Sequence, residues 1–175
     1  MKKLIPIMAV LLSLIFLFPG AGLAATASAS LTGPGTVRAG DTITLTFNLN
    51  GSNILGCEGS LSYDSSQVTL TGTRARISSP WTFHFANNRF VLEDTRQEKP
   101  INSRTAMFSA TFRVNNSLPA GTRITVSASG KASDGKTEAN VSASYSATLA
   151  APLSSNANLR SLTVSNATLS PSFRG

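Results

Sequence analysis

Alternation of apolar and polar residues is the feature that most constrains how this chain folds. Between Thr42 and Leu49 every second residue is apolar, and the residues between them are Thr or Asn. Successive side chains of a β-strand point to opposite faces, so this segment predicts a strand with one buried face. The pattern recurs in shorter or similar segments at 57–63, 68–71, 83–85, 90–92, 108–114, 124–128 and 141–149.

Turn-forming residues separate these segments. Asn87 and Asn88 suit the left-handed backbone of a tight hairpin. No stretch between Leu31 and Leu149 has the i, i+3, i+4, i+7 apolar spacing of a surface helix. The sequence therefore predicts an all-β fold, an antiparallel β-sandwich of eight or nine strands. The other turn clusters, rich in Gly, Pro, Asn, Asp and Ser, lie at 33–35, 50–53, 64–66, 115–121 and 133–136.

Residues 1–29 have the organisation of a secretory signal peptide. Two lysines precede an apolar run over 4–18, and small residues follow over 21–29. The run is shorter than the roughly 20 apolar residues that span a bilayer, which argues against a membrane anchor. The pattern predicts a protein that is secreted or held at the cell surface, with no membrane span after cleavage. Three cleavage positions fit, after Ala24, Ala27 or Ala29.

The composition changes again near the C-terminal end. Residues 150–156 are small and polar, which is typical of a linker. A further apolar pattern begins at Leu159, but residues 157–175 are too few to close a core of their own. The predicted organisation is one sandwich over 31–149, a linker over 150–156 and the incomplete start of another domain over 157–175.

The charge of the chain is mildly positive. The formal net charge is +7, and without Lys2 and Lys3 the chain has 13 basic and 8 acidic residues, or +5. The basic residues are scattered singly, unlike the clusters of a nucleic-acid-binding surface. A solvated surface is the simpler interpretation, and attraction to an acidic cell wall or an acidic partner is the alternative. Cys57 is the only cysteine, so we expect no intramolecular disulfide and a buried thiol.

Candidate catalytic and metal-binding residues are few. His84 is the single histidine, and alternation with Phe83 and Phe85 turns it outward as a polar strand residue. No serine lies in a G-x-S-x-G motif, one Cys and one His do not make a zinc set, and the acidic residues form no calcium loop or obvious glycosidase pair. The sequence therefore predicts a protein that is not an enzyme and has no cofactor.

Trp81 has two interpretations. It follows Pro80 and directly precedes a predicted strand. Its indole either closes one end of the core or stacks on a sugar ring, in which case His84 and Phe90 would continue the row. Trp81 and His84 are therefore the candidates for direct carbohydrate binding.

Two stretches of the sequence resemble a cohesin module. The run GDTITLTFNL over 40–49 and the run GCEGSLSYDSSQVTL over 56–70 are similar to the GDT strand, the alternating strand ending in Tyr-Asp and the V-x-L strand of that family. Segments 108–114, 119–121, 124–126 and 133–135 resemble its later strands and turns in the same order. The resemblance covers 31–149 and rests on the combination. Gly59 departs from it, because a large apolar residue is usual there, and 73–88 is shorter than in cellulosomal cohesins.

The resemblance implies a nine-stranded, jelly-roll-like sandwich that docks a dockerin domain of another secreted protein, in polysaccharide degradation or surface assembly. Calcium belongs to the dockerin in that family. The tail over 156–173 is similar to the start of a cadherin-like β-sandwich repeat of bacterial surface proteins. The alternatives are a direct carbohydrate-binding module and a structural spacer of a surface adhesin. The implied docking residues are Glu58, Ser60, Ser62, Arg89, Val91, Glu93, Ser127 and Ser129.

Overall fold

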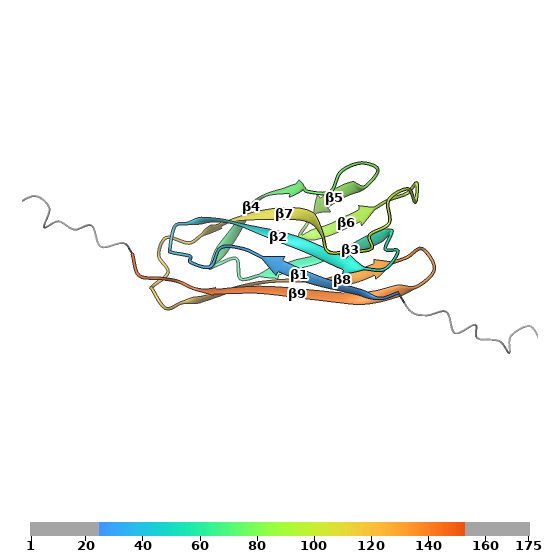
Figure 1. Ribbon diagram of the computed structural model, residues 1–175. Helices are drawn as coiled ribbons and strands as arrows, with labels where there is room; N and C mark the ends of the chain where they lie inside the picture. Colours follow the sequence, from blue (N-terminus) through green and yellow to red (C-terminus); the bar gives the residue numbers. More distant parts are fainter. Residues whose placement is uncertain (1–24, 153–175) are drawn as a thin grey trace, which may run out of the picture.

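Nine β-strands account for most of residues 25–152, the part of the chain that the structure, a computed structural model, describes (Figure 1). The start of the expected signal peptide and the expected cadherin-like segment lie outside these residues. No helix within 25–152 could cross a membrane. The strands are β1 (Ala27–Thr32), β2 (Thr42–Gly51), β3 (Gly56–Tyr63), β4 (Val68–Ala75), β5 (Thr82–Ala86), β6 (Arg89–Glu93), β7 (Thr105–Val114), β8 (Arg123–Ser133) and β9 (Glu138–Thr148).

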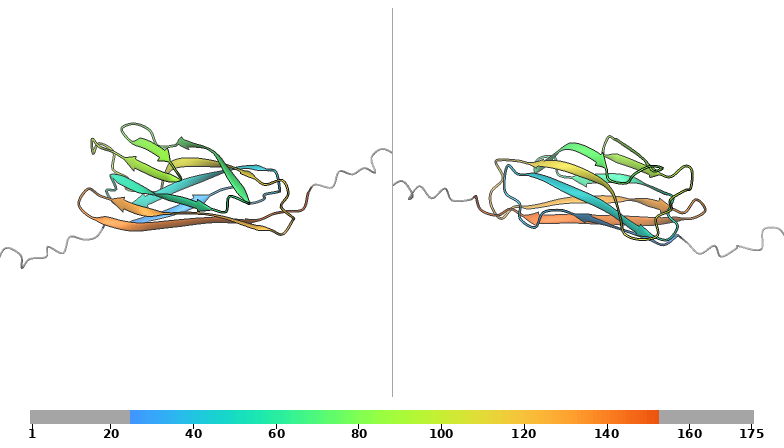
Figure 2. Two further views of the ribbon diagram at one scale, coloured as in Figure 1. Left: turned by 180° about the vertical axis from the view of Figure 1, so that it is seen from behind. Right: turned by 45° about the horizontal axis from the view of Figure 1, so that its top comes forward.

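The strands form two antiparallel sheets packed face to face. One sheet has four strands in the order β1-β2-β7-β4, and the other has five in the order β5-β6-β3-β8-β9. The views in Figure 2 show the two layers from behind and from above. The architecture confirms the predicted all-β, jelly-roll-like sandwich with nine strands.

Strand β1 lies partly within the segment that the sequence assigns to the signal peptide. Ala25 is already buried, and its backbone N–H donates to Thr137 Oγ1 at 2.8 Å. Pairing with β2 then runs from Ala27 opposite Gly51 to Thr32 opposite Thr46. The sandwich therefore begins before the expected boundary at Leu31. Alanine and serine are both small, so they show little of the apolar-polar contrast that marks the other strands.

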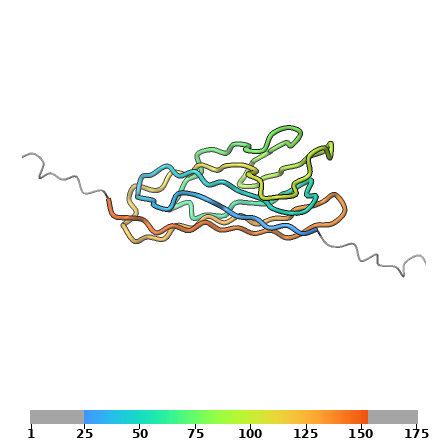
Figure 3. The backbone as a smooth tube through the Cα atoms, viewed as in Figure 1, coloured from blue at the N-terminus to red at the C-terminus, as the bar shows by residue number. Residues whose placement is uncertain are grey.

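Strands β1 and β9, far apart in the sequence, lie side by side and close one long side of the sandwich (Figure 3). On the other long side, β4 and β5 are the edge strands of their sheets. The two ends of the described chain leave from opposite ends of the long axis (Figure 1).

An aromatic cluster joins the two sheets. The ring of Phe108 on β7 lies 5.2 Å from that of Phe47 on β2, 5.0 Å from that of Phe90 on β6 and 5.1 Å from that of Phe83 on β5, measured between centroids. Phe47, Phe90 and Phe108 are almost completely buried. Offset and tilted ring pairs at these distances are favourable beyond the burial of their area. The cluster therefore fixes how the four-stranded sheet sits on the five-stranded sheet.

A pair of glycines lies beneath this cluster. Gly59 on β3 and Gly130 on β8 are direct cross-strand partners, and both face the core. A Cβ atom on Gly59 would overlap the backbone oxygen of Ser129 and lie 2.7 Å from Cζ of Phe90, and one on Gly130 would overlap the backbone oxygen of Glu58. The Phe90 ring thus occupies the space above Gly59, and the backbones of β3 and β8 approach each other closely at the pair. This explains why Gly59 stands where the resembling family has a large apolar residue, since β6 supplies the bulk instead.

We predict that Gly130→Ala destabilises the protein by about 1–3 kcal/mol, because the added methyl group meets backbone rather than a movable side chain. Gly72→Ala is the matched control, since a Cβ atom there meets nothing within 4 Å, and it should change stability by less than about 0.5 kcal/mol. Urea denaturation of both variants measures the difference. Equal stability of the two variants would contradict the packing described here.

Candidate functional site

The outer face of the five-stranded sheet brings the predicted docking residues together. Across three neighbouring strands, Val91 on β6 stands opposite Glu58 on β3, which stands opposite Lys131 on β8. In the next row, Arg89 stands opposite Ser60, and Ser60 opposite Ser129. Side chains two residues apart share a face, so the other predicted residues follow on the same side. We call this surface the five-stranded face, made of Glu58, Ser60, Ser62, Arg89, Val91, Glu93, Ser127, Ser129 and Lys131.

Lys131 is the member that sequence reasoning missed. The sequence pattern predicts this strand only as far as Ala128, because Gly130 interrupts the series of apolar residues. In the structure β8 continues to Ser133. The apolar or small inward series in fact continues through Gly130 to the buried Ala132. The sequence signal for Lys131 is its alternation with the small inward residues Gly130 and Ala132.

Val91 lies on β6, at one end of the row that it forms with Glu58 and Lys131. It is 38% exposed, and it is the one large hydrophobic residue among 25–152 that is exposed. Its cross-strand neighbours are His84 on β5 and Glu58 on β3. A small apolar contact surrounded by polar side chains is the usual anatomy of a protein-binding surface.

Charges of both signs surround this apolar spot. Lys131 Nζ donates to Glu138 Oε2 on β9 at 2.7 Å. The hydrogen bond and the negative charge of Glu138 raise the pKa of Lys131, and the charge of Glu58 adds to that effect. Both partners of the ion pair are more than half exposed, so it contributes little to stability and can exchange partners when another molecule binds.

Two shallow depressions mark the five-stranded face. One is lined in part by Val91 and Glu93, and the other by Ser60, Arg89 and Ser129, with Glu58 and Lys131 contributing to both. Small serine side chains and charged side chains together line the second depression. Such relief suits side chains of a second protein better than a small molecule that needs enclosure.

The proposed row of sugar-stacking aromatics is wrong. Trp81 is only 7% exposed, and its indole N–H donates to the backbone oxygen of Lys99 at 2.9 Å. Phe90 is 1% exposed and belongs to the aromatic cluster. Trp81 therefore closes one end of the core, because its ring is covered and its N–H has a backbone partner. His84 alone is exposed, beside Val91.

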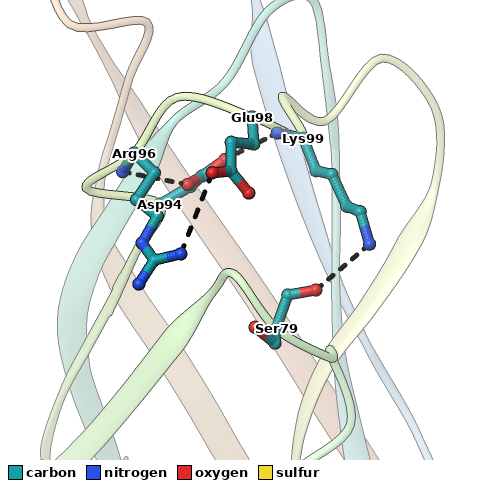
Figure 4. A network of polar contacts seen from close by, with 5 residues as sticks. All are labelled: Ser79, Asp94, Arg96, Glu98 and Lys99. Atoms are coloured by element: carbon teal, nitrogen blue, oxygen red, sulfur yellow. Dashed lines mark hydrogen bonds and ion pairs between the residues drawn. The ribbon is translucent and has the colours of Figure 1, made fainter.

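A buried carboxylate organises the loop that follows β6 (Figure 4). Asp94 is 2% exposed, and it accepts hydrogen bonds from the backbone N–H groups of Arg96 at 3.2 Å and Lys99 at 2.7 Å. Lys99 Nζ in turn donates to the backbone oxygen of Ser79 at 3.2 Å, and Arg96 lies 3.9 Å from Glu98. The loop is thereby tied to the turn before Trp81. Asp94 has a structural role that the sequence did not reveal.

Cys57 is buried behind Glu58, as the sequence predicted. Burial, and to a lesser extent the negative charge of Glu58, raise the pKa of its thiol to about 12. The thiolate is the reactive form of cysteine, so this group is a poor nucleophile at neutral pH. In the described part of the chain, no three His, Cys, Asp or Glu side chains gather in a way that could hold a metal ion.

We predict that Cys57 of the native protein reacts with iodoacetamide far more slowly than that of the unfolded protein, because the shift of its pKa from 9.0 to about 12 makes the thiolate population about a thousandfold smaller. Intact mass at successive times measures the labelling. Cys57 is the only cysteine, so the same protein in denaturant serves as the control. Equally fast labelling in both conditions would contradict the burial of the thiol.

Comparisons with known proteins place the fold. No protein-family model matches the sequence, and no curated protein matches it. Solved cohesin modules do match the structure, at identities that establish the fold alone. The third cohesin of ScaC from Acetivibrio cellulolyticus, solved in complex with the ScaB dockerin, is 16% identical with a TM-score of 0.58, over 72% of this chain and 100% of that one.

Two further cohesin structures show the same likeness. The cohesin of the Coh-OlpC-Doc435 complex, a type I cohesin–dockerin complex from Clostridium thermocellum, is 15% identical with a TM-score of 0.55, over 70% of this chain and 94% of that one. The cohesin module of a family 33 glycoside hydrolase from Clostridium perfringens is 10% identical with a TM-score of 0.57, over 73% of this chain and 98% of that one. Residues 25–152 therefore have the fold of a cohesin module, as the sequence resemblance implied.

Proposed function

We propose that this chain is a non-catalytic binding module of the cohesin type, which docks a dockerin domain of another exported protein through its five-stranded face. The observation that carries the proposal is the coincidence of a cohesin fold with one outer sheet face that gathers all eight residues expected for docking. The structurally similar cohesins from Acetivibrio cellulolyticus and Clostridium thermocellum were solved in complex with dockerins. The partner would carry the calcium.

The chemistry of the five-stranded face supports protein docking over catalysis or sugar binding. Val91 offers an apolar contact, and Glu58, Arg89 and Lys131 around it offer charges of both signs. Such a pattern selects a partner by complementary charge. Trp81 and Phe90 are buried and so cannot stack on a sugar. Catalysis by a cysteine would need an activated thiolate, and burial keeps the thiol of Cys57 protonated.

A structural spacer is the second candidate function. The described chain enters and leaves the sandwich at opposite ends of its long axis (Figure 1). Modules with this geometry can be joined end to end in a linear array. A spacer would not need the apolar contact at Val91, which is why docking is preferred.

We predict that Glu58→Lys and Val91→Asp each weaken dockerin binding by about tenfold or more, which corresponds to about 1.4 kcal/mol, because the two residues are cross-strand neighbours on the five-stranded face. Isothermal titration with calcium-loaded dockerin domains from exported proteins of the same source measures the affinity. Thr44→Lys is the matched control, since Thr44 is exposed on the other sheet.

The controls separate the two candidates. Binding that survives both substitutions would place the docking surface elsewhere, and the complete absence of binding to any such dockerin would favour the spacer.

Removal of calcium should abolish binding without changing the thermal stability of this chain, because the calcium is assigned to the partner.

We also propose that the chain is exported, to the cell surface or the medium, and that polysaccharide degradation or surface assembly is its setting. The sequence features of residues 1–29 support export. The fold adds a constraint on the cleavage position, since Ala25 is buried and Ala27 begins β1. Cleavage after Ala24 would leave the whole strand, whereas cleavage after Ala29 would leave only its last three residues.

We predict that the exported protein begins at Ala25, because the nitrogen of Ala25, which can still donate to Thr137 Oγ1 as the terminal ammonium, and the pairing of Ala27 with Gly51 belong to the fold. Intact mass of the exported protein measures the position. A chain made to begin at Ser30 should melt at a temperature several degrees lower than one beginning at Ala25, since it lacks half of β1. An exported protein beginning at Ser30 with undiminished thermal stability would contradict the prediction.

A further inference from the structure

The outer face of the four-stranded sheet differs in charge from the five-stranded face. Strands β1, β2, β4 and β7 contain no Asp or Glu, and their only charged residues are Arg74 and Arg113. Arg76 and Arg104 lie just beyond the ends of β4 and β7 and are also exposed. By contrast, the five-stranded sheet carries Glu in three of its strands. We call the outer side of the four-stranded sheet, with these four arginines, the arginine face.

The arginines form a track along β4 and β7 rather than a cluster. Arg113 stands opposite Thr69, and Arg74 stands opposite Ser109, four residues further along β7. At about 3.3 Å per residue, that separation is roughly 13 Å. The backbone N–H of Arg76 donates to the backbone oxygen of Met107, six residues from Arg113 along β7. Arg76 therefore extends the track to about 20 Å. A single small anion could not span such a length, whereas a chain with repeated negative charges could.

The geometry turns these side chains outward. Phe108 and Phe112, which alternate with Ser109 and Arg113 on β7, are buried in the core. Arg74 pairs with Ser109 beyond the irregularity between Leu70 and Gly72, and so it also faces away from the core. Neither ion pair found within residues 25–152 involves an arginine of this face. Their guanidinium groups are therefore available to a ligand.

Hydroxyl groups line the track. The hydroxyls of Thr44 and Thr111 lie 3.3 Å apart on neighbouring strands, and Thr71 Oγ1 donates to the backbone oxygen of Thr111 at 3.0 Å. Thr42 and Thr69 stand on either side of Arg113. Hydroxyls donate to and accept from sugar hydroxyls equally well. The described part of this face exposes no large hydrophobic residue, which a bilayer or unstacked bases would require.

We propose that the arginine face binds an elongated polysaccharide that bears carboxylate groups. Arginine is the residue that binds carboxylates with two parallel hydrogen bonds, and the threonine hydroxyls would bind the neutral parts of the sugar chain. This face and the five-stranded face are on opposite sides of the sandwich, so both can be occupied at once. The module would then join a docked protein to an acidic glycan.

Polygalacturonate is the probe for this proposal, and fully methyl-esterified polygalacturonate is its uncharged match. Affinity electrophoresis and isothermal titration of the purified protein should show binding to the first and none to the second, with binding weakened by added salt. The double variant Arg74→Gln/Arg113→Gln should bind about tenfold or more weakly. Arg74→Lys/Arg113→Lys should recover part of the affinity, because it keeps the charge and loses the paired hydrogen bonds.

Arg123→Gln/Lys136→Gln is the matched control, since it removes the same charge from the other sheet and its turn. It should change polygalacturonate binding by less than about twofold. The proposal is overturned if the protein does not bind polygalacturonate, if it binds the methyl-esterified form equally well, or if the control loses as much affinity. Tighter binding of duplex DNA or of anionic lipid vesicles would overturn it in favour of that partner.

The proposal can fail independently of dockerin docking. Arg74 and Arg113 are exposed and lie outside the five-stranded face, so their substitution should leave the melting temperature and dockerin binding unchanged. A loss of both activities in Arg74→Gln/Arg113→Gln would show a general defect and overturn the assignment of a separate face.

Discussion

The packing of the Phe90 ring over Gly59 is the contact on which the rest of the sandwich depends. Phe90 also packs against Phe47 and Phe108 of the opposite sheet. Glycine on β3 leaves the space that the ring fills, so one side chain joins two strands of one sheet, β6 and β3, to two strands of the other. Because β3, β6 and β8 are held in this register, their outward residues form one continuous surface.

A sandwich built in this way separates stability from recognition. The inward residues of every strand belong to one core, and their identity is limited by packing. The outward residues are free of that limit. On the five-stranded face they combine an apolar spot with charges of both signs, and on the arginine face they combine guanidinium groups with hydroxyls. One fold thereby presents two outer surfaces of different chemistry.

Sequence reasoning reached most of the candidate site because side-chain direction in a strand is local. Glu58, Ser60 and Arg89 could be assigned to the outside from alternation, and the resemblance to cohesins supplied the strands that lie side by side. Lys131 was missed because Gly130 hid the second half of β8. Trp81 has two interpretations in the sequence because the hydrogen-bond acceptor of its indole, the backbone oxygen of Lys99, comes from a loop 18 residues away.

The amino-acid sequence by itself determined that the described chain is all-β, where most strands lie and which of their residues face outward. These properties follow from the two-residue period of side-chain direction along a strand, which can be recognised from residues that are close together in the sequence. Only the tertiary structure decided that β1 begins within a run of small residues, that Asp94 and Trp81 are buried, and that Phe90 fills the place of a side chain at Gly59. Each of these depends on contacts between residues far apart in the chain, which no local pattern records.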